Sequence, residues 1–521
     1  MLDLAIPYNP QRVSRARWLL AAAVLMAGAM LPLAFAPYGW SWIAIASPLI
    51  LFLVWLKATP GQSFTYGWIY GLGMFGVGVS WVFVSIHDFG GVPLAMSIFL
   101  TGLFIVFLAL FPALLGYLIN RFFSGSSRET KLLLIMPAAW VLAEWVRGWF
   151  LTGFPWLLLG YSQIDQPLGG FAPLLGVYGI SWAVVLTSGL LLVVTLDPRG
   201  IRRFAYSAAL VLLWGGAFAL NHYTWTQPSG KPLKVSLIQG NIAQDMKWDA
   251  DMRDPTIDLY STLTRAHWDS DLIVWPESAL PDFYHEVEGY LEELAREAKA
   301  NNSHLLIGVL YMDAKTTNYY NSVVSLGGAR PEFYHKQHLV PFTEYLPLQN
   351  VFGPIVKFMD VPMSDFSKGA SDQAPLAVAG QKVGIDICYE DAFGEELIRS
   401  LPAATFLVNV SNDAWFGESI APAQHLQIAR MRAKETGRPL LRGTNTGITA
   451  IIAADGTELA RVPQFEVQVL TGTIQPMQGS TLYAMLGNVL VVTGLFAILG
   501  LVVWMRYLVR FRTARGVAES S

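Results

Sequence analysis

Cysteine and charged residues are both scarce in this sequence. Cys388 is the single cysteine among 521 residues, which excludes an intrachain disulfide and leaves the redox compartment undetermined. Charged side chains make up 14% of the chain, whereas soluble domains carry about 25%. The net charge of −3 gives no general basic surface, so nucleic acid is not expected as a partner. Since 53% of the residues are hydrophobic, the composition predicts a membrane protein with a sizeable polar portion.

Several motifs that carry chemistry are also missing. His335 and His338 do not have the H-E-x-x-H spacing, and no Cys or carboxylate cluster stands at metal-ligand spacing, so no metal site or cofactor is expected. A G-x-S-x-G elbow is absent, which argues against Ser/His/Asp catalysis. There is no P-loop for nucleotide phosphates.

Long apolar runs are plentiful, and runs of roughly 17–25 residues are typical of transmembrane helices. We expect about eight spans, at Trp18–Phe35, Ser41–Leu56, Phe64–Val84, Val92–Ile119, Leu132–Phe150, Phe171–Leu196, Phe204–Asn221 and Ala484–Leu508. The first span ends in Ala34-Phe-Ala36 and resembles a signal peptide, but more spans follow at once, so we expect it to be retained.

The distribution of Lys and Arg predicts the orientation, because cytoplasmic loops are enriched in both. Loops 36–40, 86–91 and 152–170 contain neither residue, whereas the alternate loops and both ends of the chain do. We therefore expect cytoplasmic termini and an outer segment from Thr224 to Leu482, which is periplasmic if the membrane is a bacterial inner membrane.

One charged pair lies late in the fifth expected span. Glu144 and Arg147 are three residues apart, so they share a helix face and can neutralise each other. Charges inside spans often mark functional sites. Near the outer end of a span the pair is either a plain interfacial pair or a contact for a lipid headgroup. The loop that follows, rich in Gly, Pro and aromatic residues, would lie on the membrane surface or close over a site.

The outer segment changes character and alternates strand-like with helical patterns, which is typical of an α/β domain of packed layers. Expected helices cover Ile257–Ala266, Glu288–Ala300, Glu390–Ser400 and Pro422–Thr436. We therefore divide the chain into a transmembrane domain (residues 1–223), an outer catalytic domain (224–482) and a final helix with a cytoplasmic tail (483–521).

The stretch from Val383 to Asp391 centres on Cys388. Val383, Ile385 and Ile387 alternate as in a strand, and Cys388 follows directly before the helical run. A thiol facing a helix N-terminus is favoured as a thiolate. The alternative is that a lone cysteine is simply a small buried apolar residue.

Two further polar residues follow strand-like runs. Glu277 comes after Pro276, which ends a strand, and Lys336 lies in a polar–apolar stretch typical of a site loop. A carboxylate, an ammonium and a thiol can act as base, oxyanion stabiliser and nucleophile in acyl transfer. Each also has a structural alternative, a cap or surface carboxylate for Glu277 and a solvated charge for Lys336.

Four motifs carry a family resemblance: Trp275-Pro-Glu277, Lys336-Gln-His-Leu-Val-Pro-Phe-Thr-Glu344, Gly384-Ile-Asp-Ile-Cys-Tyr-Glu390 and Asn409-Val-Ser-Asn-Asp-Ala-Trp-Phe416. With these, the outer segment resembles the nitrilase (carbon–nitrogen hydrolase) superfamily. Over nearly its whole length, the chain resembles the apolipoprotein N-acyltransferase family.

The resemblance implies an αββα sandwich with a Glu277–Lys336–Cys388 triad. It also implies that Glu344 supports the triad, that Tyr389 and Glu390 shape the pocket, and that Trp248 and Trp415 contact substrate, although both tryptophans could instead be packing residues. The implied reaction moves the sn-1 acyl chain of a phospholipid, preferably phosphatidylethanolamine, through a Cys388 thioester. The acceptor would be the N-terminal amine of a diacylated apolipoprotein.

Two other functions remain open from the residues. A membrane-tethered amidase would use the same triad with water as the acceptor. A lipid- or lipoprotein-binding protein would need a degenerate triad, and all three residues are present. The chain is expected to be a monomer whose partners are its substrates.

Overall fold

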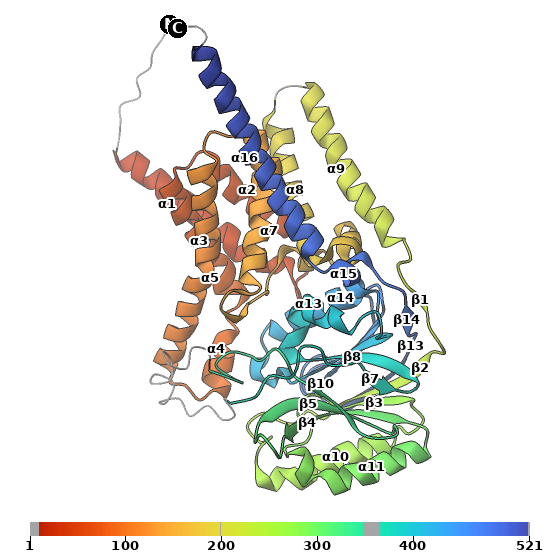
Figure 1. Ribbon diagram of the computed structural model, residues 1–521. Coiled ribbons are helices and arrows are strands. Elements are labelled where there is room, and N and C mark those ends of the chain that lie inside the picture. Colours follow the sequence, from red (N-terminus) through yellow and green to blue (C-terminus); the bar gives the residue numbers. More distant parts are fainter. Residues whose placement is uncertain (1–9, 198–199, 347–364, 519–521) are drawn as a thin grey trace.

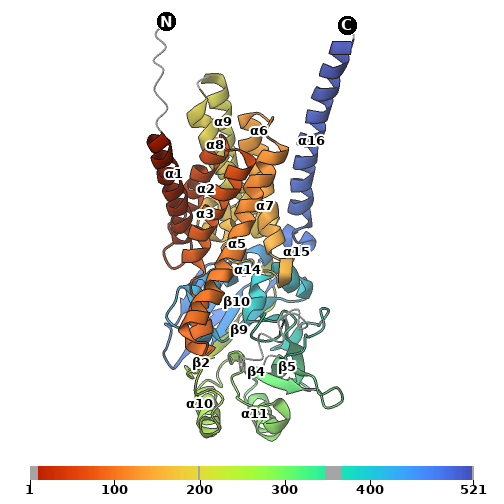
Figure 2. The same cartoon turned by 90° about the vertical axis from the view of Figure 1, so that its left-hand side faces the viewer.

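The computed structural model describes residues 10–197, 200–346 and 365–518, which form a bundle of long helices and a part built from two β-sheets (Figure 1). Both views show the sheets beyond one end of the bundle (Figures 1 and 2). The bundle elements are α1 (Pro10–Met30), α2 (Ile43–Trp55), α3 (Pro60–Gly78), α4 (Val82–Val84), α5 (Leu94–Phe122), α6 (Arg128–Thr130), α7 (Met136–Arg147), α8 (Ala172–Leu196), α9 (Gly200–Asn221) and α16 (Val489–Ala518).

The helices are apolar enough for a membrane. Within the described ranges, five segments are long and apolar enough to cross one, or six if Pro60–Gly78 and Val82–Phe89, bent by 60°, form one broken span. Of the remaining expected spans, one is the shorter apolar helix α2, and the other forms π-helical turns at Lys131–Ile135 followed by α7. The total of about eight spans therefore stays a prediction.

Glycines allow three bundle helices to approach closely. A Cβ atom at Gly67 or Gly71 of α3 would lie 2.3 Å from Pro112 O or 2.6 Å from Ala109 Cα of α5. On the other side of α3, a Cβ at Gly73 would lie 2.3 Å from the carbonyl oxygen of Leu25 in α1. Small residues at helix contacts are the usual way in which membrane helices gain close packing.

The other part of the chain contains two six-stranded sheets. One has the order β12-β11-β10-β9-β8-β7, and the other has the order β13-β2-β3-β4-β5-β6. Their strands are β2 (Leu233–Gln239), β3 (Leu272–Val274), β4 (His304–Met312), β5 (Tyr319–Leu326), β6 (Glu332–His335), β7 (Leu376–Val378), β8 (Gln381–Ile387), β9 (Phe406–Ser411), β10 (Leu440–Thr444), β11 (Ala450–Ile452), β12 (Glu458–Arg461) and β13 (Gln468–Ile474).

Successive side chains of each strand point to opposite faces of its sheet, and this alternation produces four layers. On β9, Val408 and Val410 enter the core between the two sheets, whereas Leu407 packs against α14 (Ala421–Thr436). On β3, Val274 enters the same central core, and Ile273 packs under α10 (Arg253–Arg265) and α11 (Glu288–Ala300). A helical layer therefore covers each sheet, which is the αββα sandwich that was expected.

The predicted helix over Glu390–Ser400 is wrong as a single element. The structure has a 3₁₀ turn at Cys388–Ala392, α13 (Gly394–Leu397) and a second 3₁₀ turn at Ile398–Ser400. The side chain of Glu390 turns inward and accepts the backbone N–H groups of Gln337, His338 and Ile387, which ties the start of this segment to the strand before it and to another loop.

Bundle and sandwich are joined by hydrogen bonds at several loops. Ser85 Oγ donates to the carbonyl of Trp415 (2.8 Å), and Trp156 Nε1 donates to Gln424 Oε1 (2.7 Å). The backbone N–H of Ala36 donates to Gln427 Oε1 of α14 (3.1 Å). Arg430 of the same helix donates to Asp165 (3.1 Å). The loops that lack Lys and Arg are therefore the ones that meet the sandwich.

Candidate active site

Strand direction gathers the predicted site residues at one edge of the sandwich. Glu277 follows β3, and Lys336 follows β6, which runs in the same direction as β4 because each is antiparallel to β5. Cys388 follows β8 of the facing sheet. The carboxyl ends of strands are where α/β proteins place their chemistry. The structure thus brings together three residues that lie 59 and 52 positions apart in the chain.

Lys336 lies between two carboxylates. Its side chain is 1% exposed, and Nζ lies 3.3 Å from Glu277 Oε1 and 2.8 Å from Glu344 Oε1. The second oxygen of Glu344 accepts the backbone N–H of Val340 (2.7 Å). Burial lowers the pKa of Lys336, but the two carboxylates and the nearby thiol outweigh it and raise that pKa well above its ordinary value. The ammonium is therefore charged at neutral pH.

The Glu277 carboxylate is held by three donors. Oε1 accepts from Asn321 Nδ2 (2.7 Å) as well as from Lys336, and Oε2 accepts from the backbone N–H of Asn412 (2.8 Å). Burial raises the pKa of Glu277, but the charge of Lys336 and the hydrogen bond from Asn321 lower it more. The net pKa lies below the usual range, so this carboxylate is ionised and able to accept a proton at neutral pH.

Cys388 is half-buried and has an unusual backbone conformation. Its φ of 54° lies in the left-handed region, which a non-glycine residue adopts only when its surroundings enforce it. Burial raises the pKa of the thiol well above its ordinary value, and the negative charge of Glu277 adds to this, against the opposing effect of Lys336. The expectation of a thiolate stabilised by a helix N-terminus is therefore wrong, because the thiol stays protonated and only a short 3₁₀ turn follows it.

A fully buried group of charges lies behind Cys388, and we call His425, Asp391, Asp413 and Arg442 the buried ion cluster. His425 Nδ1 lies 3.0 Å from Asp413 Oδ1, and its Nε2 lies 3.0 Å from Asp391 Oδ1 and 3.2 Å from the Cys388 carbonyl. Arg442 donates to Asp413 (2.8 Å) and approaches Asp391 (3.4 Å). Two cations thus balance two anions, as buried charges require.

His425 carries its charge at neutral pH. Burial and Arg442 lower its pKa, but Asp391 and Asp413 raise it more, to a net value of about 9. An imidazolium donates from both ring nitrogens, which suits two carboxylates and the Cys388 carbonyl. The cluster therefore holds the backbone at Cys388 in place.

Glu390 connects the Lys336 loop to the Cys388 turn. Its Oε1 accepts the backbone N–H groups of Gln337 (2.6 Å) and His338 (2.9 Å), and its Oε2 accepts that of Ile387 (2.7 Å) and the Tyr334 hydroxyl (3.1 Å). Burial raises its pKa to about 7. With all these contacts buried, the carboxylate acts as a cross-link between two loops.

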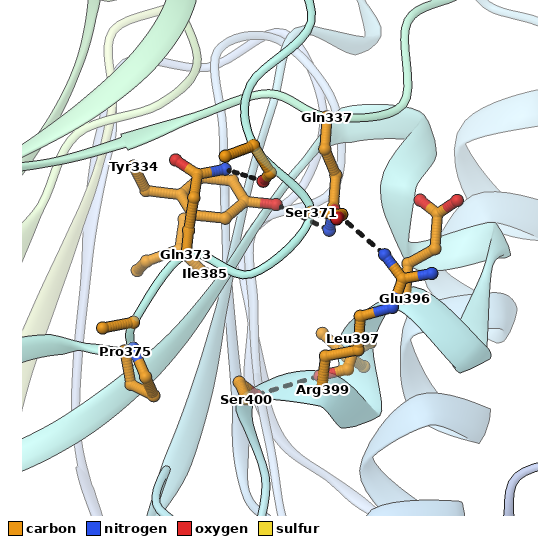
Figure 3. A pocket seen from close by; sticks show the side chains of 12 residues that line it. Tyr334, Gln337, Ser371, Gln373, Pro375, Ile385, Glu396, Leu397, Arg399 and Ser400 are labelled. Carbon is orange, nitrogen blue, oxygen red and sulfur yellow. Dashed lines mark hydrogen bonds between the residues drawn. The ribbon is translucent and has the colours of Figure 1, made fainter.

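A small polar pocket lies on the outer side of this cross-link (Figure 3). Gln337 bonds to the Tyr334 hydroxyl (3.2 Å) and accepts from Arg399 (3.3 Å) there. The volume of this pocket, about 20 Å³, suits a water molecule rather than a substrate. Glu277, Lys336 and Cys388 do not line it.

The remaining predicted residues lie around the triad in different environments. Tyr389 donates to the carbonyl of Gly153 (3.2 Å) and stacks on Trp156, so it faces the bundle. Trp415 is half-buried and contacts Phe89 at a centroid distance of 6.3 Å. Trp248 is 41% exposed in the loop after β2.

Comparisons with known proteins identify the family of the chain. The family model described as "Apolipoprotein N-acyltransferase N-terminal domain" matches residues 27–190, and the carbon-nitrogen hydrolase model matches residues 234–482. A relative named apolipoprotein N-acyltransferase from Methylococcus capsulatus is 49% identical over 466 residues, covering 89% of this chain and 92% of the relative. The chain belongs to the apolipoprotein N-acyltransferase family.

A second relative of that name, from Nitrosomonas europaea, is 45% identical and covers 92% of this chain and 95% of its own length. Among solved structures, a carbon–nitrogen hydrolase from Helicobacter pylori G27 is similar over 47% of this chain and 90% of its own, with 16% identity and a TM-score of 0.36. Membership of the N-acyltransferase family favours the acyl-transfer function over the amidase and binding-protein alternatives.

The N-acyltransferase site also contains residues that sequence reasoning missed. Asn321 donates to both Glu277 and Glu344 (2.7 and 3.2 Å). Lys247, next to the predicted Trp248, is 4% exposed and donates to the Glu277 carbonyl (3.2 Å), and burial lowers its pKa to about 8. Asn412 could have been found from the sequence, because it lies inside the motif Asn409–Phe416. Asn321 could not, because it lies in β5 among both polar and apolar residues and belongs to none of the four motifs.

Glu144 and Arg147 serve the loop that follows them. Glu144 Oε1 accepts from Trp140 Nε1 (3.1 Å) and the Leu159 amide (3.0 Å), and Arg147 donates to the Phe154 carbonyl (2.8 Å). Both side chains are buried, at 5% and 4% exposure, so the structure favours neither a surface pair nor a headgroup contact. They fix the loop between bundle and sandwich on which Tyr389 rests.

Proposed function

We propose that this protein transfers an acyl chain from a phospholipid to the N-terminal α-amino group of a diacylglyceryl-cysteine apolipoprotein through a thioester on Cys388. The observation that carries the proposal is the convergence of Glu277, Lys336 and Cys388 at one edge of the sandwich, in a chain of the N-acyltransferase family. Because the Cys388 thiol is protonated and the Glu277 carboxylate is ionised, the first proton transfer in this proposal runs from Cys388 to Glu277.

In the first half-reaction, Glu277 takes the thiol proton as Sγ attacks the ester carbonyl of the donor. The Lys336 ammonium stabilises the oxyanion of the tetrahedral intermediate. Collapse of that intermediate breaks the ester C–O bond, and Glu277 returns the proton to the departing glycerol oxygen. The products are a lysophospholipid and the Cys388 thioester.

In the second half-reaction, the α-amino group of the apolipoprotein attacks the thioester carbonyl and loses a proton to Glu277. Lys336 again stabilises the oxyanion, and the C–S bond breaks as Cys388 recovers its proton. The new amide gives the triacylated lipoprotein. Glu344, held against Lys336 at 2.8 Å, keeps the ammonium in place in both steps.

The proposed topology has about eight spans, cytoplasmic termini and a periplasmic catalytic domain covering residues 224–482 between a transmembrane domain (1–223) and a final helix (483–521). This topology is supported by the loops without Lys or Arg, which contact the sandwich. The short helix α6 (Arg128–Thr130), which begins with a basic residue, lies at the end of the bundle away from the sheets (Figure 2). Both lipid-anchored substrates would then reach Cys388 from the outer leaflet of a bacterial inner membrane.

For the finer assignments we propose the sn-1 chain as the one transferred, phosphatidylethanolamine as the donor and a monomer as the working unit. Trp248 and Trp415 are the proposed substrate-contacting tryptophans, and Tyr389 and Glu390 the residues that shape the pocket. The partial exposure of both tryptophans supports the first assignment.

The test is the intact mass of the purified protein after incubation with phosphatidylethanolamine, with and without hydroxylamine. We expect a gain of one acyl chain that hydroxylamine removes, that Cys388→Ser lacks, and that a diacylated lipopeptide discharges. Absence of an adduct with every phospholipid tested would overturn the proposal. Discharge by water alone, at the same rate as with lipopeptide, would favour the amidase.

A further inference from the structure

An apolar groove runs along the helical bundle, away from the polar residues around Cys388. It lies between α8, α9 and the π-helical turns at Lys131–Ile135, and its volume is about 990 Å³. Leu133, Trp182, Leu190, Tyr206, Leu213 and Tyr223 are among its lining residues. This volume lies at the upper end of the usual range for ligand pockets, which is about 300–1,000 Å³.

The groove exists because α9 is attached to the bundle mainly by its C-terminal half. Trp214 Nε1 donates to Thr187 Oγ1 (3.1 Å), and Asn221 Nδ2 donates to the Pro167 carbonyl (3.0 Å). Figure 1 shows α9 standing apart from the rest of the bundle, and residues 201–205 at its N-terminal end are all exposed. Such a gap between membrane-spanning helices must be filled by something apolar.

Basic residues stand at the open end of this groove. Its lining residues on α9 recur at helical spacing, at Tyr206, Ala209, Leu213, Gly216 and Leu220, and one more step of four residues leads to Arg202. Arg203 is the next residue, and both arginines are exposed.

The opposite side of the opening carries a further arginine. Arg128 Nη1 lies 3.4 Å from the Leu196 carbonyl at the end of α8. Within the described part of this end, the acidic residues are Glu129, paired with Arg128, and Asp197, which is 3% exposed. The exposed charge at the mouth of the groove is therefore positive.

We propose that this groove binds an anionic phospholipid, with its acyl chains between α8 and α9 and its phosphate at Arg128, Arg202 and Arg203. The apolar lining matches the chains, and the arginines match a phosphate bidentately. Basic pockets between membrane helices are suited to anionic headgroups. This lipid is a bound component rather than the acyl donor, since none of the lining residues belongs to the cluster around Cys388.

The test uses native mass spectrometry of the delipidated full chain titrated with phosphatidylglycerol, and with phosphatidylcholine for comparison. We expect tighter binding of phosphatidylglycerol, and weakening of it by roughly tenfold or more in the Arg202→Gln/Arg203→Gln variant, because two basic residues near the headgroup are lost. The charge-matched control is Arg296→Gln/Lys299→Gln on α11, which should bind as the parent does.

A second pair of variants tests the groove itself. A Cβ at Gly216 or Gly215 would meet nothing within 4 Å, so both accept a side chain without a clash, but only Gly216 lines the groove. Gly216→Phe should abolish retention of phosphatidylglycerol, whereas Gly215→Phe should not. Equal binding of both lipids, or unchanged binding in Gly216→Phe, would overturn the proposal. Thioester formation on Cys388 should persist in all these variants, which separates this result from a failure of the catalytic assignment.

Discussion

His425 offers the sharpest quantitative test of the structure, because its charge is paired on both sides. Its two ring nitrogens lie 3.0 Å from Asp391 and from Asp413, and these carboxylates raise its pKa from 6.5 to about 9. A group whose pKa is raised by folding stabilises the folded state below its unfolded pKa, and that contribution is lost as pH rises through the folded pKa. Stability should therefore fall across the alkaline range.

The size of the loss follows from the pKa difference. One pKa unit corresponds to about 1.4 kcal/mol, so the full contribution of His425 is about 3 kcal/mol, of which about 2 kcal/mol disappears between pH 7 and 9. For a domain of this size, 1 kcal/mol shifts Tm by about 2–4 °C, so the expected drop is roughly 4–8 °C. Glu390, with a pKa raised to about 7, and Lys247, with a pKa lowered to about 8, also titrate within this window, but they do so in both the parent and a His425 variant and therefore cancel in the difference between the two.

The measurement is Tm at pH 7 and pH 9 for the parent and for His425→Gln in the same detergent. The parent should lose roughly 4–8 °C more than the variant, and the variant should already be less stable at pH 7, because a buried anion pair has lost one cation. His285→Gln, an exposed position, is the matched control and should follow the parent. The same pH slope in His425→Gln as in the parent would show that another group titrates and would refute the assigned charge state.

Three further changes test the catalytic assignments. Lys336→Ala should slow thioester formation by about 10²–10³-fold, as for a lost oxyanion donor, and near-normal rates in single-turnover mass measurements would remove Lys336 from the triad. Glu277→Gln keeps the size of the side chain but removes the base, so acylation should fall by about 10²–10⁴-fold and recover partly at high pH as the thiol ionises; a rate independent of pH would contradict this. Gly308→Ala should also reduce acylation, because its Cβ would lie 2.1 Å from Pro276 O and 2.8 Å from Glu277 Cα, whereas Gly289→Ala, where nothing lies within 4 Å, should act like the parent.

Regular elements with clear periodicity could be predicted from the sequence. The predicted helix over Glu288–Ala300 has the bounds of α11, because its apolar residues recur on one face and the rest are charged. β10 is not among the strands that the sequence predicts, since Leu440-Leu-Arg-Gly-Thr444 contains an arginine and a glycine and does not look like a buried strand. Arg442 is tolerated there only because Asp391 and Asp413, far away in sequence, neutralise it.

Some residues of the candidate site could be predicted from the sequence, and others could not. Motifs identified Glu277, Lys336 and Cys388, and strand direction brings them together, although their catalytic roles stay a prediction until the mass experiment is done. The protonation state of the thiol could not be predicted, because it depends on burial and on Glu277 from another sheet. Asn321 and His425 could not be found either, since each acts through contacts that exist only in the folded chain.

The attachment of the sandwich to the bundle sets a geometric rule for substrates. β1 (Gln227–Pro228) pairs with β14 (Met477–Gln478), so the chain enters and leaves the sandwich side by side, and the bonds at Ser85 and Trp156 restrain it from tilting. These contacts give Cys388 a defined position relative to the ends of the helices. The enzyme would then select acyl donors by the depth of their carbonyl below the membrane surface. On this proposal, an ester near the glycerol backbone of a bilayer lipid would meet that condition, whereas an identical ester on a water-soluble carrier would not.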